Sequence, residues 1–450
     1  ERKKVQLHAY PPNLNILDTL FLEVNQDQKW FEIYPIQFEK DSLESDFKII
    51  KNINQDPKIK TIAKFSETLI DQYYKCNKID FGPISETLTK NKFEGQRISL
   101  NFRTNKEFYK NSIISAYFGY GTKDNITKYG LQIKLRNKEL NSFQVALNSI
   151  SDIEYLQDPF IDIILFPNKI NYASEDLLYS LFRRSETEEM VYYNKNEFSI
   201  SKEINNVNIS ISFGKKYIQK NNKLLIQKNI SQNIGRLEFK YSRQKKIKSH
   251  FDIINTIMKY PILFGQIDFI QNIKNNKQTI KLRFATLNTV NTSIYGKTKY
   301  LLSLGLIKNY DYLSIYNLEI NRGNESYIYR FDKSSLMNMN EFICDRYCAF
   351  YLENNYEGRI INNIPIINKL NLRELITANI IIGNLHDKNN LQNLPEFISP
   401  LSYTNPYLEA GFGLDNIFKI LRLNAIWRLS HLNNKNTVKY GVFGSINITI

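Results

Sequence analysis

The chain has 450 residues, with 60 Lys and Arg against 45 Asp and Glu, and therefore a formal net charge of +15. Its 13% aromatic content, spread along the whole length, excludes wholesale disorder, and three cysteines cannot form a disulfide framework. No run approaches the roughly 18–20 uncharged apolar residues of a membrane-spanning helix. Two classes stay open, a soluble protein and a membrane protein built from strands.

The excess of Lys is scattered along the chain instead of being concentrated in one segment. Asn, Ile and Lys crowd together throughout, as a strongly A+T-rich coding sequence would produce. Phosphate binding gains affinity from clustered Lys and Arg. Because no such cluster is present in the sequence, no nucleic-acid partner is expected.

The first part of the chain differs from the rest. Residues 1–30 are expected to be the tail of an upstream region, since no apolar signal segment follows Glu1. Residues 31–92 are expected to be a lead-in to the next domain. Within it, apolar residues recur near a 3.6 period over about 57–76, which predicts one amphipathic helix.

From residue 93 onward the apolar period changes to two. Polar residues alternate with apolar ones over these segments: 97–103, 128–136, 207–214, 236–241, 421–429 and 440–450. Many such runs last nine residues or more, which is longer than the roughly 5–6 residues of a soluble sandwich strand and close to the ten or so of a barrel strand that crosses a membrane. The pattern predicts an all-β fold, a transmembrane antiparallel β-barrel of about 14–16 strands over residues 93–450.

Four stretches interrupt the alternation and are expected to connect strands. Residues 151–187 contain a helix-like segment and are interpreted as an excursion outside the wall. Residues 309–341 and 385–405 are too irregular for a wall. Residues 433–436 are expected to form a short turn at the periplasmic end.

The charged residues on the polar side of the strands are the main site candidates. If the alternation is assigned correctly, these point into the lumen: Arg97, Arg103, Lys134, Arg136, Arg236, Glu238, Arg283, Glu409, Arg422 and Arg428. They form either a ladder of ion pairs that fills the lumen or a polar path for a solute, lipid or polypeptide. Tyr117, Tyr129, Tyr300 and Trp427 are expected to be interface anchors on the other face.

Other motifs give little sign of chemistry. His8, His250, His386 and His431 show no zinc-pair spacing, so no metal, cofactor or catalytic residue is assigned. A barrel hydrolase would need a His at its mouth, and His250 or His386 would be the candidate. Cys344 and Cys348 are expected to be two small wall residues on one face of a strand.

Several motifs together resemble a Bacteroidota outer-membrane β-barrel family of uncharacterised function. They occur in this order over residues 29–450: 29–36 (KWFEIYPI), 91–97 (NKFEGQR), 120–124 (YGTKD), 323–325 (GNE), 339–342 (MNEF), 372–374 (LRE), 406–411 (PYLEAG) and 427–429 (WRL). Members of that family commonly carry an upstream carboxypeptidase-regulatory-like domain. The chain departs from the family pattern with Asn354-Asn355 before Tyr356, where a His is usual, and with Ile450 as the last residue.

The resemblance implies an outer-membrane barrel with a periplasmic lead-in, and it implies no established activity. The segment 31–90 is expected to lie on the periplasmic side of the barrel or to occlude part of its lumen. We therefore expect an integral, non-enzymatic protein of the cell outer membrane that acts in transport, assembly or organisation of that membrane. Its expected partners are outer-membrane lipid and an unknown solute or envelope protein. The alternatives are a basic soluble β protein that binds polyanions and an outer-membrane barrel hydrolase.

Overall fold

A computed structural model describes Thr61, Thr68 and residues 71–137, 143–166, 169–171, 177–184, 189–246, 256–292, 295–309, 314–365, 367–386 and 394–446. The chain divides into two compact units, Glu1–Asp71 and Gln72–Ile450. Most of the predicted helix over 57–76 lies outside the described residues. Thr61, Thr68 and Asp71 are helical, but residues 74–76 form strand β1, so the helix ends earlier than predicted.

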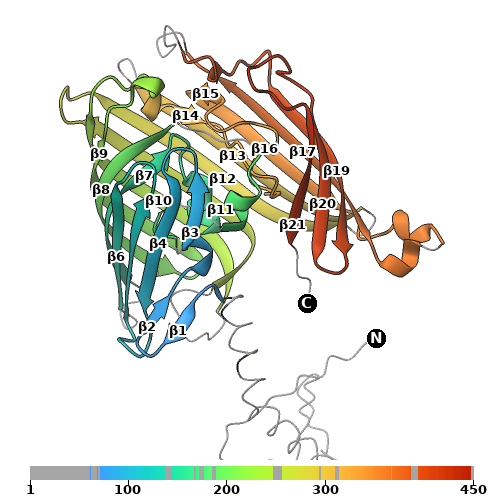
Figure 1. Ribbon diagram of the computed structural model, residues 1–450, viewed down its shortest axis with the longest axis horizontal. Coiled ribbons are helices and arrows are strands. Elements are labelled where there is room, and N and C mark those ends of the chain that lie inside the picture. The colour runs from blue at the N-terminus through green and yellow to red at the C-terminus, as the bar shows by residue number, and fades with distance from the viewer. Residues whose placement is uncertain are drawn as a thin grey trace, which may run out of the picture. The chain divides into compact units, whose positions relative to one another are not determined.

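The wall of the second unit is one antiparallel sheet whose long strands pair in chain order, and a smaller three-stranded sheet accompanies it (Figure 1). Within the described residues, fifteen strands of seven to seventeen residues form the wall. They are β4 (Gly95–Thr104), β5 (Ser112–Gly121), β6 (Thr127–Asn137), β7 (Phe143–Tyr155), β8 (Met190–Ile204), β9 (Val207–Ile218), β10 (Ile230–Lys246), β11 (Thr256–Asn272), β12 (Gln278–Thr292), β13 (Gly296–Asn309), β16 (Arg346–Asn355), β17 (Arg373–Asn384), β19 (Tyr407–Ile417), β20 (Leu421–Arg428) and β21 (Tyr440–Ile446). The predicted transmembrane β-barrel of about 14–16 strands is confirmed in architecture.

One further wall position precedes β4 and is broken into pieces. Strands β2 (Ile79–Phe81) and β3 (Leu88–Asn91) both pair with β4, and η1 (Ile84–Glu86) separates them. Strand β1 (Tyr74–Cys76) pairs with β2. The predicted boundary at residue 92 is therefore too late, because residues 74–91 belong to the sheet. Strands of three or four residues are too short to show a period of two.

The two ends of the wall differ in their connections. The turn end, defined by the links β4–β5, β8–β9 and β19–β20, has mostly short connections. The loop end, defined by the links β7–β8, β13–β16 and β17–β19, has the longest ones. The segment 433–436, predicted at the periplasmic end, lies in the β20–β21 link. That link is at the loop end, because β20 runs away from the β19–β20 turn.

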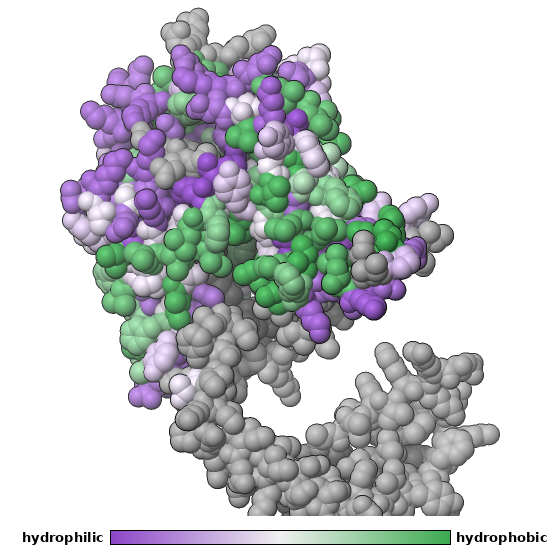
Figure 2. Space-filling view, turned by 45° about the vertical axis from the view of Figure 1, so that its right-hand side comes forward, coloured by the Kyte–Doolittle hydropathy of each residue, from purple (hydrophilic) through white to green (hydrophobic). Residues whose placement is uncertain are grey.

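The side chains of the wall are sorted in the opposite way to those of a soluble protein. In β4, Ile98 and Leu100 are both 57% exposed, whereas Arg97 is 4% exposed. In β9, Ile211 and Phe213 are exposed and Ser212 is buried. Figure 2 shows the result, on the face in view, as a band of apolar side chains across the wall, with hydrophilic side chains beyond it toward the loop end. An apolar outer face and a polar enclosed face are the arrangement of a barrel in lipid.

The link between β13 and β16 folds back into the enclosed space and is called here the plug, residues 314–345. It contains η3 (Ile315–Asn317), β14 (Glu319–Ile320) and β15 (Phe342–Cys344), and β18 (Ser399–Pro400) pairs with β15. Its residues are almost all buried, including polar ones such as Asn324 and Ser334, both at 0% exposure. The sequence predicts only that this region is not wall; its burial inside the barrel is a finding of the structure.

The β7–β8 link also turns inward, contrary to the prediction that it lies outside the wall. Helix α3 (Phe160–Leu165) places Phe160, Ile161 and Ile164 in an apolar cluster with residues of β11, β12 and the plug. Helix α4 (Leu177–Leu181) follows. Three apolar side chains on one short helix need cover, and the plug and inner wall supply it.

Two of the remaining short elements lie at the turn end. Helices η4 (Ile361–Asn363) and η5 (Ile367–Leu370) occupy the β16–β17 link. Helix η2 (Asn222–Leu224) is in the β9–β10 link at the loop end. Leu224 of η2 is buried in an apolar cluster with plug residues Ile315 and Leu318.

Candidate functional site

The enclosed space has two unlike halves. The open half is the inner face of β5–β10, and it borders a cavity of about 1670 Å³. The filled half is the inner face of β12–β21, and the plug lies against it. Eight of the ten candidate residues lie in these two halves, and Arg97 and Arg103 lie in β4.

Small side chains explain why the open half is empty. Ala146, Ser199 and Ser212 stand opposite one another on β7, β8 and β9, and Ser201 stands opposite Ser210 one step nearer the turn end. All five line the cavity. Because these five side chains are small, this part of the inner face leaves room for water or a ligand.

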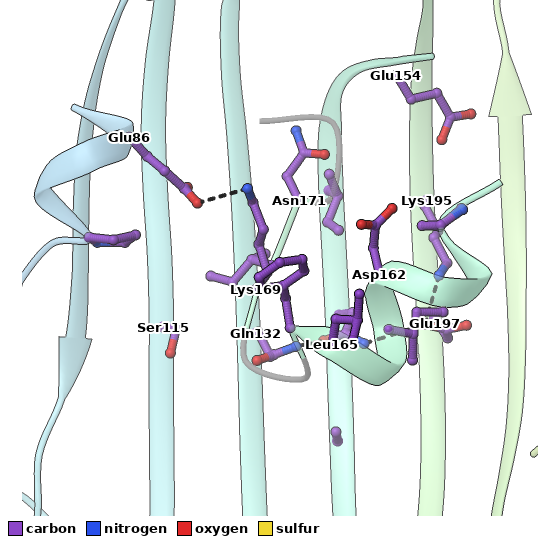
Figure 3. A pocket seen from close by; sticks show the side chains of 18 of the residues that line it. Glu86, Ser115, Gln132, Glu154, Asp162, Leu165, Lys169, Asn171, Lys195 and Glu197 are labelled. Atoms are coloured by element: carbon purple, nitrogen blue, oxygen red, sulfur yellow. Dashed lines mark hydrogen bonds and ion pairs between the residues drawn. The ribbon is translucent and has the colours of Figure 1, made fainter. Parts of the chain in front are cut away.

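Charged groups surround this small-residue floor (Figure 3). Glu86 and Lys169 point toward each other across the cavity at 3.3 Å, and Lys195 binds Glu197 at 2.8 Å. Residues of α3 and plug residues 330–333 also line the cavity. It reaches Arg136, Glu203 and Lys240 near the turn end.

The predicted residues of the open half are only partly neutralised. Arg136 and Glu203 are 3.8 Å apart, Glu238 accepts a hydrogen bond from Ser210 at 2.8 Å, and all four residues line the cavity. Lys134 also lines it and makes no ion pair or hydrogen bond with any residue that the structure describes. Arg236 is held by Asp268 at 2.7 Å. This half therefore presents charge to the cavity.

Three of the four predicted residues of the filled half, all except Arg422, hold the plug. Arg283 binds plug residue Glu319 at 2.9 Å and Asp268 at 3.0 Å. Arg428 makes a two-pronged ion pair with plug residue Glu341, at 2.6 and 3.0 Å. The wall and the plug are thus tied by fully desolvated charges, which are strongly coupled because water does not screen them.

Glu409 holds the plug through its backbone. Its carboxylate accepts hydrogen bonds from the N–H groups of Ser335 and Leu336 at 2.7 and 3.1 Å, and from Asn379 and Tyr407. Four donors compensate a carboxylate that is 3% exposed.

The three remaining candidates make ion pairs within the wall. Arg97 binds Asp152 through two 2.8 Å hydrogen bonds, and Arg422 binds Glu353 at 2.8 Å. Arg103 is 3.3 Å from Asp80 and stacks over the ring of Tyr73.

A second ionic cluster joins the plug to α3. Arg322 binds Asp162 with both guanidinium nitrogens at 3.0 Å, and Arg330 binds Asp162 and Asp332 at 2.9 and 2.7 Å. Burial opposes ionisation of Asp162, but Arg322 and Arg330 outweigh it and hold its pKa well below the ordinary value. Burial, with Arg330 beside it, lowers the pKa of Lys333 to about 8.

The sequence pattern did not identify the carboxylates that form ion pairs with the candidate residues. Asp152 and Asp162 fall in the stretch interpreted as an excursion, and Glu319 and Glu341 fall in or beside an irregular one. A signal was present for Asp152, which continues the polar parity of β7. The plug carboxylates have no periodic neighbours, so no sequence pattern could place them.

The expected anchors are not all on the outer face. Tyr129 and Trp427 are 48% and 49% exposed there, and Tyr300 is half-buried. Tyr117 is 5% exposed and donates a hydrogen bond to Asp152 at 2.7 Å, so its assignment as an anchor is wrong. It shares its parity with Gly119 and Gly121, whereas Phe118 and Tyr120 occupy the outer face.

Among the described residues, the His and Cys side chains form no cluster. His8 and His250 lie outside the described residues, and His431 packs edge-on against Phe342. Cys344 is buried in β15 of the plug and Cys348 lies in wall strand β16, so they do not share one strand as predicted. Within the described ranges, no group of three His, Cys, Asp or Glu side chains could hold a metal ion.

No helix among the described residues has the length and apolar character to cross a membrane.

No family model and no curated protein matches the chain. Among solved structures, BamA from Haemophilus ducreyi lacking POTRA domains 1–3 is similar at a TM-score of 0.45 and 10% identity, covering 83% of this chain and 71% of that one. CdiB from Acinetobacter baumannii is similar at a TM-score of 0.40 and 12% sequence identity, and the match covers 82% of this chain and 59% of that one. At these scores the fold rests on the chain's own strand pairing.

Proposed function

We propose that this chain is an integral, non-enzymatic protein of the outer membrane that takes part in protein assembly or transport there. Membrane insertion is supported by the outward-facing apolar belt and by the charged inner face. The order of its motifs supports a place in the Bacteroidota barrel family that it resembles. A passive pore is not favoured, because the plug packs against the inner face of β12–β21.

The observation that carries the proposal is the seam between the last and first wall strands. Among the described residues, β21 pairs with no wall strand except β20. Its free edge is occupied at one point by the plug: Tyr329 donates its N–H to the Gly444 carbonyl at 2.7 Å, and Gly444 donates to the Tyr327 carbonyl at 2.9 Å.

The same plug segment continues the contact toward the first strand. Tyr327 donates to the carbonyl of Phe182 at 2.7 Å, and the Arg183 side chain donates to the carbonyl of Lys90 in β3 at 2.8 Å. Loop segments therefore take the place of direct pairing between β21 and β3. An unpaired strand edge is costly in lipid. We infer that release of the plug exposes an edge that a client strand can pair with.

A reversible lock tests this function. Ile328 and Gly444 are bridge partners, so the variant I328C/G444C places two thiols where a disulfide can form. In a C76S background, the oxidised variant is expected to lose outer-membrane assembly or transport in cells that depend on it, and reductant is expected to restore it. The matched control S199C/S212C joins two wall partners and is expected to stay active when oxidised.

Two results would contradict the proposal. Full activity of the oxidised I328C/G444C protein would show that the edge is not used. Recovery of the chain from the aqueous fraction without detergent, with no heat-modifiable gel mobility, would instead support a soluble protein that binds polyanions.

A further inference from the structure

The outer face carries two rows in which a glycine stands between two phenylalanines. The first row is Phe213, Gly235 and Phe269, on β9, β10 and β11. The second is Phe239, Gly265 and Phe284, on β10, β11 and β12. A Cβ added at Gly235 would lie 3.7–3.9 Å from Phe213 and Phe269, and one at Gly265 would meet nothing within 4 Å. Each glycine therefore leaves an apolar notch.

The notch at Gly235 belongs to a groove of about 1010 Å³. Phe213 and Phe269 flank the notch itself, and their side chains are 64% and 51% exposed. Register extends the same row through Phe198 and Leu147 on one side and Ile280 on the other. A chain of methylene groups would find apolar contact along this whole row.

What distinguishes this groove is the next row toward the loop end, one pleat away on the same outer face. It consists entirely of polar side chains: Ser149, Asn196, Lys215, Asn233, Gln271 and Gln278. No carboxylate stands in that row. Lys215 is exposed and makes no ion pair or hydrogen bond with the part of the chain that the structure describes.

The second notch lacks this border. Gly265 lies in a groove of about 460 Å³ whose outer-face lining includes Ile209, Leu237, Ile267 and Leu282. The row on its loop-end side is Leu237, Ile267 and Leu282, which is wholly apolar. The two notches have the same Phe-Gly-Phe form, and only the first meets a cation and amides at the edge of the apolar belt.

We propose that the Gly235 groove binds one phospholipid with an anionic headgroup. An acyl chain lies in the notch between Phe213 and Phe269, and the phosphate is bound by Lys215 and the amides of its row. Charge complementarity selects the occupant, because a single exposed cation bordered by hydrogen-bond donors favours a phosphate group. Glu197, a carboxylate that lines the groove, is bound by Lys195 at 2.8 Å. Such a lipid would hold the β9–β11 wall at a fixed depth in the membrane.

The test is retention of lipid by the purified full chain. The protein is incubated in detergent with mixed micelles of phosphatidylglycerol and phosphatidylcholine, and native mass spectrometry counts the lipids that stay bound. One phosphatidylglycerol is expected per wild-type chain. K215Q is expected to retain it about five-fold less, as the loss of one interfacial Lys implies, and G235L at least five-fold less, because Leu fills the notch.

Two matched variants control for general effects. G265L fills the other notch, and K202Q removes an exposed outer-face Lys on β8 near the turn end. Both are expected to retain lipid as the wild type does. The proposal would be overturned if G265L lost as much bound phosphatidylglycerol as G235L, or if the wild type retained phosphatidylcholine as well as phosphatidylglycerol. It would also be overturned if a second copy of the chain covered the groove, seen as a dimer that carries no lipid.

The lipid site requires insertion into a membrane but does not require the proposed function at the seam. The lipid site and the seam function can therefore be disproved separately. A chain that inserts and shows heat-modifiable mobility but retains no phosphatidylglycerol contradicts only the lipid site. A chain that partitions into water contradicts the proposed function.

Discussion

The open and filled halves of the enclosed space are built from strands with the same polar and apolar alternation, but the inner face is left open in one half and is covered by the plug in the other. In the open half, Ser and Ala on β7–β9 leave a cavity, and Lys134 faces it without a partner among the described residues. In the filled half, Arg283, Glu409 and Arg428 are each bound by the plug. The alternation of polar residues identifies the inner face of the wall. It does not show whether the lumen is open, because that depends on whether a long loop folds back into it.

The largest expected difference between the halves comes from removing a charge. Arg428→Met leaves the carboxylate of Glu341 buried and unpaired, because Arg428 and Glu341 are 3% and 2% exposed. We expect a loss of about 3–5 kcal/mol in the free energy of unfolding. Urea titration, read as the fraction of heat-modifiable band, measures it.

Lys134→Met is the matched change in the open half. It removes a charge that no described carboxylate neutralises, so we expect a change below about 1 kcal/mol. Similar losses in the two variants would show that the halves do not differ.

A second prediction concerns the two faces within the open half. Ile211→Arg puts a charge in the middle of the apolar belt, where the cost is about 2–4 kcal/mol. Ser210→Arg, one residue away, puts the same group on the inner face beside Glu238, and little cost is expected. The same titration compares them, and equal losses would refute the assignment of faces.

A smaller effect is expected from pH on the plug. The pKa of Lys333 is about 8, below its ordinary value of 10.5, so the folded protein binds fewer protons than the unfolded chain between these values. Stability therefore rises with pH in this window, by about 1 kcal/mol between pH 7 and pH 9. Unfolding at the two pH values measures it, and Lys333→Met is expected to remove the difference. A loss of stability toward pH 9 in the wild type only would contradict the assigned direction.

The period of two was sufficient to predict the wall and its two faces. Ile98, Ile211 and Trp427 are outward, and Arg97, Ser212 and Arg428 are inward, as the alternation requires. This works because a strand exposed to lipid on one face and polar on the other leaves no freedom in register.

The plug could not be predicted in the same way. Its polar residues, among them Asn324, Ser334 and Glu341, are typical of an exposed loop, yet each is at most 2% exposed. Their burial depends on donors and acceptors supplied by distant strands, such as Arg428 for Glu341. The broken first strand was missed for a different reason, since β2 and β3 are three and four residues long.

Thiol labelling of neighbouring residues tests the central claim, a barrel with a lipid-facing outside and a water-filled half inside. In a C76S background, S210C, I211C and S303C are reconstituted into phospholipid vesicles and treated with a charged, water-soluble maleimide. We expect S210C to react at least ten times faster than I211C, which faces lipid, and S303C to stay protected, because Ser303 is 2% exposed. Equal rates at S210C and I211C, or faster reaction of I211C, would contradict the account.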